Sequence, residues 1–162
     1  MSIGNVHQKG IIPNTNSDKT NLNLSGSSNL TSKLTATATI SYIKTYSNKA
    51  QKGSNVSGVM LGLLRTPPTF DNSYGLSDPV NDIRSYTQPD GSQRNYRGGI
   101  GYDNPYWTVN RNPYRQDIDR VYGSAQLDYK ANSWMTWTYR VGGDIYSQST
   151  KNAYDIHSAA FP

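Results

Sequence analysis

Leu34-Thr35-Ala36-Thr37-Ala38-Thr39-Ile40-Ser41-Tyr42 alternates apolar or small residues with hydroxyl residues along its whole length. Successive side chains of a β-strand point to opposite faces, so this stretch places its apolar residues on one face and its threonines on the other. A threonine-rich face suits water better than it suits a packed protein core. The stretch therefore predicts a strand with one apolar face and one hydrated face.

Three further segments show the same period of two. Leu22 and Leu24 alternate with asparagines, Val121 to Tyr129 alternates with polar residues, and the run after Trp134 repeats the pattern. Short polar turns at residues 29–32 and 131–133 separate two pairs of these segments. The predicted strands lie near residues 20–27, 34–46, 119–130 and 134–147, and a long loop covers residues 47–118.

The composition limits the classes of protein that fit. Hydrophobic residues make up 34% of the 162 residues and the mean hydropathy is −0.75. Both values are low for a protein that buries a large hydrophobic core of its own. No run of about 18 apolar residues occurs, so the sequence contains no transmembrane helix. A low mean hydropathy still fits a membrane barrel, whose strands expose only alternate residues to lipid. The absence of cysteine removes disulfides and thiol chemistry.

The charge and the titratable residues argue against two functions. The net charge is +5, yet the arginines between residues 84 and 115 are interleaved with aspartates, so no basic strip for nucleic acid forms. His7 and His157 are the only histidines and lie near opposite ends of the sequence. We therefore expect no nucleic-acid partner, no metal or other cofactor, and no enzymatic activity.

The long loop contains one helical pattern. Val56, Val59, Met60, Leu63 and Leu64 recur at helical spacing. Ser54 or Asn55 would supply the N-cap, and Thr66-Pro67-Pro68 would end the helix. Such a short helix is expected to pack its apolar side on the loop or on a barrel rim. The alternative is a helix that inserts into a membrane or contacts substrate.

Turn-forming residues occupy other parts of the loop. Gln88-Pro89-Asp90-Gly91-Ser92 predicts a tight turn or hairpin tip, and Arg97 to Gly101 predicts a flexible approach to the tract that follows. Asp71, Asp78 and Asp82 carry oxygen atoms that suit calcium, but their spacing does not match an EF-hand. Turn formation is the interpretation we favour for these three aspartates.

The loop is rich in aromatic residues with arginine and asparagine close in sequence, a combination that suits sugars and peptides because rings stack on ligands while polar groups fix their orientation. The asparagine before Pro105 restricts the backbone, which favours a role for the two following rings in fixing the loop. The residues that are candidates for substrate binding or for loop scaffolding are Tyr102, Asp103, Asn104, Tyr106, Trp107 and Tyr114.

Four tracts together carry a resemblance to a known family. They are Gly10-Ile11-Ile12-Pro13-Asn14-Thr15, Leu64-Arg65-Thr66-Pro67-Pro68-Thr69-Phe70-Asp71, Asp103-Asn104-Pro105-Tyr106-Trp107 and Arg140-Val141-Gly142-Gly143-Asp144. In this order they resemble motifs of SusC/RagA-like TonB-dependent outer-membrane transporters. The resemblance implies an all-β fold in which antiparallel strands form part of a transmembrane β-barrel, with one long extracellular loop that contains a short helix.

The resemblance also implies a place in a larger protein. Residues 1–162 would be a partial barrel domain, because no stretch matches the family's plug domain or a signal peptide. The expected function is a segment of an importer for oligosaccharides, peptides or similar nutrients in the bacterial cell outer membrane. Its implied partners are outer-membrane lipid, a SusD-like surface lipoprotein, the TonB complex and an extracellular nutrient ligand.

A second hypothesis is a soluble or secreted β-sheet module that binds a ligand through its aromatic loop. Such a module must bury the apolar face of its strands against another layer, and the sequence offers few further strands for that purpose. Dependence on detergent distinguishes the two hypotheses, because a barrel segment exposes apolar surface that a soluble module hides.

Overall fold

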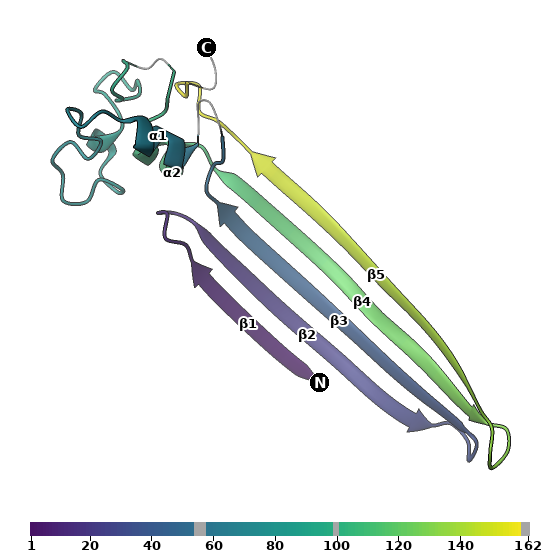
Figure 1. The fold of residues 1–162 in the computed structure, drawn as a ribbon. Coiled ribbons are helices and arrows are strands. Elements are labelled where there is room, and N and C mark those ends of the chain that lie inside the picture. Colours follow the sequence, from purple (N-terminus) through teal and green to yellow (C-terminus); the bar gives the residue numbers. More distant parts are fainter. Residues whose placement is uncertain (54–57, 99–100, 160–162) are drawn as a thin grey trace. The chain divides into compact units, whose positions relative to one another are not determined.

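The structure, a computed structural model, describes residues 1–53, 58–98 and 101–159. These residues are mostly β, with antiparallel strands in one open sheet and few helices (Figure 1). The strand order follows the sequence, so β1 and β5 are the edges of the sheet in the described part of the chain. The strands are β1 (Ser2–Lys9), β2 (Asn16–Asn29), β3 (Leu34–Lys49), β4 (Tyr114–Lys130) and β5 (Thr136–Asn152).

The four predicted strands correspond to β2 to β5, but their bounds differ. β3 continues to Lys49 and β4 begins at Tyr114, which shortens the long connection at both ends. β5 begins at Thr136 and extends beyond residue 147 to Asn152. β1 was not predicted, because Ile3 and Val6 fall on opposite faces and leave no alternation to recognise.

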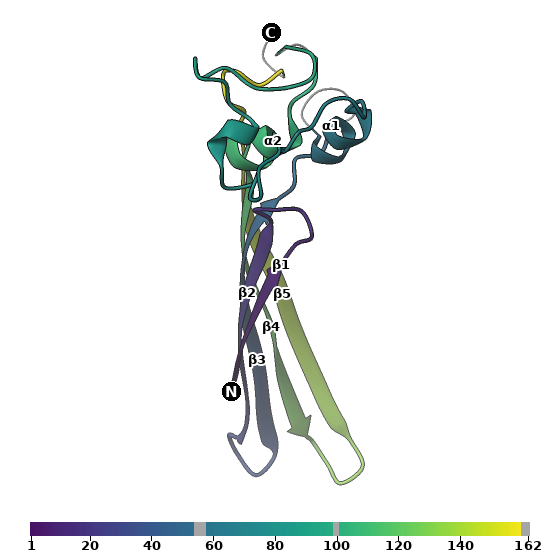
Figure 2. The same ribbon diagram turned by 90° about the vertical axis from the view of Figure 1, so that its left-hand side faces the viewer.

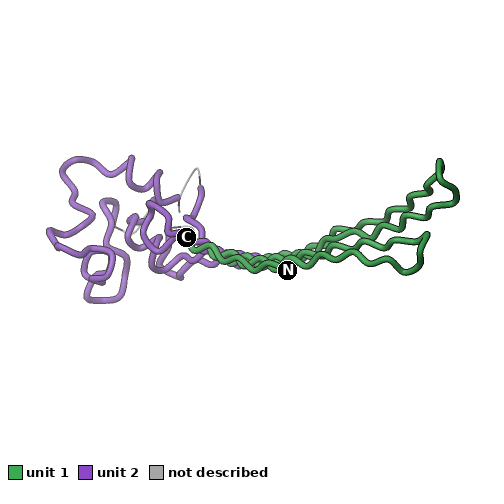
Figure 3. Tube along the Cα trace, turned by 90° about the horizontal axis from the view of Figure 1, so that it is seen from below, with its two compact units in different colours: residues 1–7, 18–46, 117–149 green, residues 8–17, 47–116, 150–162 purple. Residues whose placement is uncertain are grey.

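Contacts divide the chain into two compact units, coloured in Figure 3. Residues 1–7, 18–46 and 117–149 form one unit, here called the strand unit. Residues 8–17, 47–116 and 150–162 form the other, here called the loop unit. The structure describes the whole of the strand unit, and most of the loop unit.

The strand unit contains only the sheet and two short connections. Both connections lie side by side at one end of this unit (Figures 1 and 2), where the Lys130 N–H donates to the Lys33 carbonyl over 2.8 Å. Ser27 pairs with Thr37 across β2 and β3, and Thr138 donates to Asp128 across β4 and β5. No residue of the strand unit is buried. Both faces of its sheet are therefore open.

The loop unit holds all the buried residues that the structure describes. Its buried apolar side chains are Val59, Tyr86 and Trp107. More of its buried residues are polar, namely Ser47, Gln51, Ser85, Gln93, Asn95, Asp103, Asn104, Thr108, Asn112 and Ser158. A hydrogen-bonded polar network, together with three apolar side chains, makes up this core.

Three short helices lie in the described part of the loop unit: α1 (Val59–Arg65), the 3₁₀ helix η1 (Ile83–Ser85) and α2 (Pro105–Arg111). α2 was not predicted, although Asn104 caps it and Pro105 occupies its first turn, both of which are helix-start signals. No helix among the described residues is long and apolar enough to cross a membrane.

The predicted helix in the loop exists as α1, but it packs differently from the expectation. Its N-cap is Gly58, while Ser54, Asn55 and Val56 lie outside the described residues. Val59 is buried as expected, whereas Leu64 is 77% exposed. Met60 and Leu63 are also exposed. The helix therefore packs through Val59 and Gly62 rather than through its largest apolar side chains.

Candidate functional site

The Asn104 side chain connects several segments of the loop unit by hydrogen bonds. Its side-chain oxygen accepts from the Tyr106 N–H over 2.8 Å and so caps α2. Its side-chain amide donates to the carbonyls of Ser85 and Arg94, at 3.2 and 2.8 Å. Asn104 is 1% exposed. These bonds use both functions of the amide, so this side chain connects loop segments and leaves no group for a ligand.

Asp103 has a similar role with a charged group. Its carboxylate accepts from Gln93 Nε2 over 2.9 Å, from Asn112 Nδ2 over 3.0 Å and from the Ala159 N–H over 2.6 Å. Ser158 Oγ donates to it as well. Asp103 is 3% exposed, and no lysine or arginine of the described residues lies within ion-pair distance of it. Four donors thus compensate a buried negative charge, as burial of a charge requires.

Trp107 is the largest buried side chain of the loop unit and is 1% exposed. Its ring meets Tyr86 edge to face, with 6.2 Å between ring centroids, and meets His157 in the same way at 6.4 Å. The Arg111 guanidinium lies 5.6 Å from the centroid of the indole ring. Edge-to-face aromatic pairs add to the stabilisation that comes from burial alone. This geometry favours the scaffolding interpretation for Trp107.

The three tyrosines among the candidates lie in different surroundings. Tyr102 stacks on Tyr96 with ring planes 10° apart, and Arg65 both lies 4.5 Å above the Tyr102 ring and donates to its hydroxyl. Tyr106 is half-buried in the first turn of α2, and Tyr114 is the half-buried first residue of β4. The structure therefore brings Asp103, Asn104 and Trp107 into one core and leaves the tyrosines outside it.

A cleft of about 530 Å³ lies in the loop unit and is called the basic cleft here. Its lining combines arginines with exposed aromatic and apolar side chains and contains no acidic residue among those described. The lining residues are Tyr74, Ile83, Arg84, Thr87, Gln88, Pro89, Gly91, Arg94 and Arg111. Its volume lies within the range of small-molecule sites.

Arg94 is held rigidly in the basic cleft. Its guanidinium lies 4.5 Å from the ring centroids of both Phe70 and Tyr74. It also donates to the carbonyls of Asp71 and Ser85, at 2.7 and 3.0 Å. No carboxylate oxygen of the described residues lies within 4 Å of it. A cation held by carbonyl dipoles and aromatic faces keeps its positive charge while its side chain is fixed.

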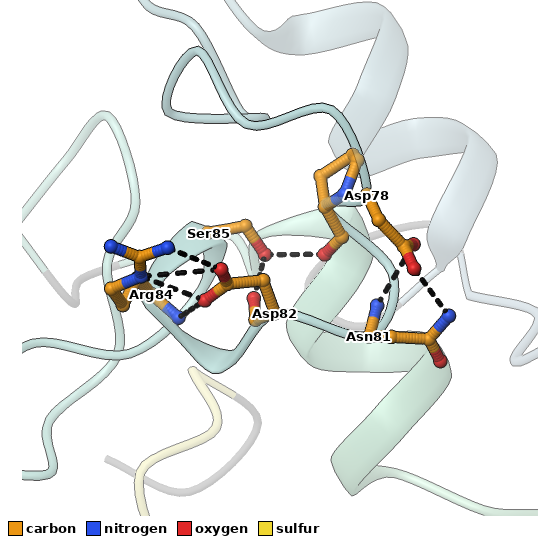
Figure 4. A network of polar contacts seen from close by, with 6 residues as sticks. Asp78, Asn81, Asp82, Arg84 and Ser85 are labelled. Carbon is orange, nitrogen blue, oxygen red and sulfur yellow. Dashed lines mark hydrogen bonds and ion pairs between the residues drawn. The ribbon is translucent and has the colours of Figure 1, made fainter.

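Arg84 is paired with Asp82 at the N-terminal end of η1, as Figure 4 shows. Its Nε and Nη2 atoms donate to the Asp82 carboxylate over 3.0 and 2.6 Å, and its backbone N–H donates over 3.1 Å. These bonds lower the pKa of Asp82 to about 2. The Ser85 hydroxyl donates to the Pro79 carbonyl beside this pair.

The other loop aspartates form turns, as predicted. Asp71 accepts from the Ser73 hydroxyl and from the N–H groups of Ser73 and Gly75, and these bonds lower its pKa. Asp78 accepts from Asn81 in the same manner (Figure 4). The predicted hairpin tip at residues 88–92 is confirmed, because Gln88 N–H donates to the Ser92 carbonyl over 2.8 Å. Part of the predicted flexible approach, Gly99 and Ile100, lies outside the described residues.

No metal site emerges from the described part of the chain, where no three histidine, aspartate or glutamate side chains gather around one point. A second cleft, of about 620 Å³, lies along the turn at residues 10–15. Asn14 adopts a φ of 60° there and donates to Asn110 over 2.8 Å. Its walls mix asparagines with Lys9, Arg115 and small apolar side chains, and they contain no aromatic ring on which a ligand could stack.

The two faces of the strand unit differ in chemistry. On one face Arg120 pairs with Asp144, Arg140 donates to Gln126, and Thr138 donates to Asp128 over 2.6 Å. The other face carries large apolar side chains that are exposed. These include Ile40, Tyr42, Val121, Leu127, Tyr129, Trp137, Tyr139, Val141 and Ile145.

Several residues of the loop unit had no individual signal in the sequence. Gln93 bridges Asp103 and Asn104, yet it stands alone in a polar stretch. Ser158 reaches Asp103 from 55 positions away in sequence. Arg94 and Arg111 were seen only as members of a dispersed basic set. The predicted turn at residues 88–92 directly precedes Gln93 and Arg94, and it was the one local pattern close to them in sequence.

No protein-family model matches the chain, and a search of curated proteins finds no significant match. The faces of the sheet and the side chains of the loop unit are therefore the basis on which a function is inferred.

Proposed function

We propose that the chain is a segment of a TonB-dependent outer-membrane importer of the SusC/RagA kind, in which the strand unit forms part of the barrel wall. The observation that carries this proposal is a continuous apolar band on one face of the strand unit. The band runs over β3 from Leu34 to Tyr42, over β4 from Val121 to Tyr129 and over β5 from Trp137 to Ile145.

The height of this band suits a membrane. Each of the three stretches has nine residues from its first to its last apolar position. A tilted strand crosses the hydrocarbon core of a bilayer in about 9–11 residues. Small residues such as Ala38 and Gly123 lie within the band and large apolar residues on either side of them.

Polar groups end the band on the same face. Tyr42 donates its hydroxyl to Asp119, and the Lys44 ammonium lies 3.7 Å from the same carboxylate. His7 pairs with Asp18 on β1 and β2. At the opposite end, beside the short connections, Tyr129 and Trp137 are exposed. Aromatic side chains at that level match the aromatic girdle of a membrane interface, which we assign to the periplasmic side.

The other face suits an aqueous lumen. Charged and amide side chains on β4 and β5 bond to one another while they remain open to solvent, as the Arg120 to Asp144 pair illustrates. A barrel interior filled with water tolerates such side chains, and a lipid-facing surface does not. The alternation of apolar and polar side chains along each strand therefore suits a barrel wall, with lipid on one face and water on the other.

The open edges of the sheet support the proposal that the chain is part of a larger barrel. β1 and β5 each present unpaired backbone groups along one side, and in lipid such groups must be bonded. In the proposed barrel, further strands pair with both edges. The loop unit then lies on the extracellular side, where a nutrient ligand and a SusD-like lipoprotein would approach it, and the TonB complex acts on the whole importer.

A pair of cysteine variants tests the orientation of the sheet. The chain has no cysteine, so Ser124→Cys and Ala125→Cys each create a unique labelling position on opposite faces of β4. We would attach a nitroxide to each in the membrane-embedded protein and measure collisions with oxygen, which enters lipid, and with a water-soluble nickel chelate. The proposal requires oxygen to dominate at position 125 and the nickel chelate to dominate at position 124.

The alternative, a soluble or secreted ligand-binding module, makes the opposite forecast. If the nickel chelate dominates at both positions and the protein stays monomeric without detergent, the apolar band does not face lipid and the barrel proposal fails. Burial of position 125 against both reagents, in a protein soluble without detergent, would support the module, because a second protein layer would then cover the band.

A further inference from the structure

We infer that the basic cleft and the hollow beside it form one binding site for a small ligand that carries a carboxylate next to a flat apolar surface. The inference rests on the proposed function, since it names the class of cargo that the loop unit would meet first. It uses only side chains of the loop unit.

The two cavities share a wall. A hollow of about 370 Å³ is lined by Trp107, Tyr154, Asp155, Ile156 and His157, and it has Gly91 and Arg111 in common with the basic cleft. The Arg111 side chain therefore stands at the junction of the two. A ligand that fills both parts places its centre against this guanidinium.

Two of the three arginines of the site have a carboxylate close by, so little net positive charge remains for a ligand. Asp82 holds Arg84 through several hydrogen bonds. Arg111 lies 3.9 Å from a carboxylate oxygen of Asp155, so these two charges offset each other only loosely. Arg94 is held between backbone carbonyls and aromatic rings. A singly charged carboxylate suits this balance better than a doubly charged phosphate.

Arg111 is the arginine whose N–H groups can still donate to a ligand, with the Asp155 carboxylate 3.9 Å away as a competitor. Arg94 donates to backbone carbonyls and Arg84 donates to Asp82, whereas the Arg111 guanidinium makes no hydrogen bond with any residue that the structure describes. Its side chain is 41% exposed. A guanidinium offers two parallel N–H groups that match the two oxygens of a carboxylate. The Trp107 ring beneath it limits its motion.

Apolar side chains line the rest of the site. Tyr74 and Ile83 are exposed in the basic cleft, and Pro89 lies beside them. Tyr154 lines the adjoining hollow. Flat rings and aliphatic groups next to a cation recognise a ligand with a hydrophobic face close to its charge. Both acidic sugars and acidic peptides with aromatic residues have this chemistry.

Calorimetry with matched probes tests the inference on the detergent-solubilised protein. The sugar probes are a galacturonic acid trimer and its methyl ester. The peptide probes are a terminally blocked phenylalanine-glutamate-phenylalanine tripeptide and its glutamine counterpart. We expect at least one acidic probe to bind, and to bind about tenfold or more tightly than its neutral partner, since a charged hydrogen bond contributes on that scale. The pair that shows the difference identifies the source of the carboxylate.

Variants assign the effect to Arg111. Arg111→Gln is expected to weaken the acidic probe about tenfold and to remove its advantage over the neutral one. Arg111→Lys keeps the charge without the planar fork and should fall between the two. The control is Arg115→Gln, which removes a positive charge from the loop unit outside both cavities. It should alter the affinity less than twofold.

A variant that binds more tightly than the original protein cannot be explained by misfolding. Asp155→Asn removes the loose counter-ion of Arg111 and keeps the side-chain shape, so the acidic probe should bind several-fold more tightly. Equal affinity for charged and neutral probes, no binding of any acidic probe, or no response to Asp155→Asn would overturn the inference. The spin-label test is independent, so it identifies separately a failure of the barrel proposal.

Discussion

Gly62 of α1 lies directly against the backbone carbonyl of Asp103, so closely that a Cβ added at position 62 would stand 2.7 Å from that oxygen. The contact joins the predicted helix to the tract that precedes α2, through two residues that are 41 positions apart in sequence. It explains why α1 packs through a glycine while Leu64 stays exposed.

Gly62→Ala should therefore destabilise the loop unit despite the better helix propensity of alanine. The backbone carbonyl cannot move as a side chain would, so we expect a cost of about 1–3 kcal/mol in the free energy of unfolding. Leu64→Ala on the same helix should change it by less than about 0.5 kcal/mol. Hydrogen exchange of residues 103–111 measures both, and equal exchange in the two variants would contradict the contact.

Asp103→Asn should disorganise the polar core. The substitution keeps the size of the side chain but replaces a charged acceptor of four hydrogen bonds with a neutral amide, one end of which faces donors. We expect a loss of about 2 kcal/mol or more. Asp78→Asn, which affects one exposed turn, is the control. Limited proteolysis of the folded protein should cut the loop unit faster only in the first variant.

Trp107→Ala and Trp134→Ala form a matched pair. Trp107 is buried in the loop unit, while Trp134 lies in a short connection and is 79% exposed. Removal of Trp107 should cost about 3–5 kcal/mol, because a cavity replaces its contacts with Tyr86 and His157. Removal of Trp134 should leave the loop unit unchanged. Denaturant unfolding followed by loop-specific exchange measures both costs, and an equal cost in the two variants would contradict the burial of Trp107 in the core.

Acid should open the turn at η1 at an unusually low pH. The Asp82 pKa is lowered from 3.8 to about 2 by the bonds from Arg84, so its stabilisation is complete above about pH 4 and is lost as the pH falls through about 2. Arg84→Gln should return the pKa of Asp82 toward 3.8. Carboxyl titration by NMR measures this shift, and an unchanged midpoint in Arg84→Gln would show that Arg84 is not the cause.

Gly123→Ala should disturb the sheet, whereas Gly143→Ala should not. A Cβ at position 123 would stand 2.4 Å from the Thr39 carbonyl on β3, while a Cβ at position 143 meets nothing within 4 Å. The first variant forces two strands apart, and the second only stiffens the unfolded chain, which stabilises by a few tenths of a kcal/mol. Yields of folded protein in detergent compare the two. Similar yields would show that β3 and β4 are less closely packed at this point.

The strands were largely predictable because their signal is local. Successive residues of the stretch 34–42 face opposite sides of the sheet, so apolar and hydroxyl residues alternate along the sequence and the strand can be recognised from neighbouring positions alone. β1 escaped prediction because its place depends on pairing with β2, as the bond between Asn23 and Ser2 shows, rather than on its own pattern. Sequence reasoning found the turns of the loop for the same reason that it found the strands.

The loop core was less predictable because its bonds are long-range. Asn104 and Pro105 do carry a helix-start signal, but a helix of seven residues offers too little periodicity to weigh against an irregular loop. The partners of Asp103 lie at positions 93, 112, 158 and 159, and no rule of spacing joins them. Of the aromatic candidates, Trp107 lies in the core while Tyr102, Tyr106 and Tyr114 lie outside it, and the arginines that line the basic cleft came together only in the structure.

The bond from Ser158 to Asp103 has a consequence for biosynthesis. The ribosome releases Asp103 and Asn104 well before the segment that follows β5, so the nascent loop lacks two of the four donors to its central carboxylate until residues 158 and 159 have emerged. During synthesis the loop unit is therefore incompletely ordered until the segment after β5 has emerged.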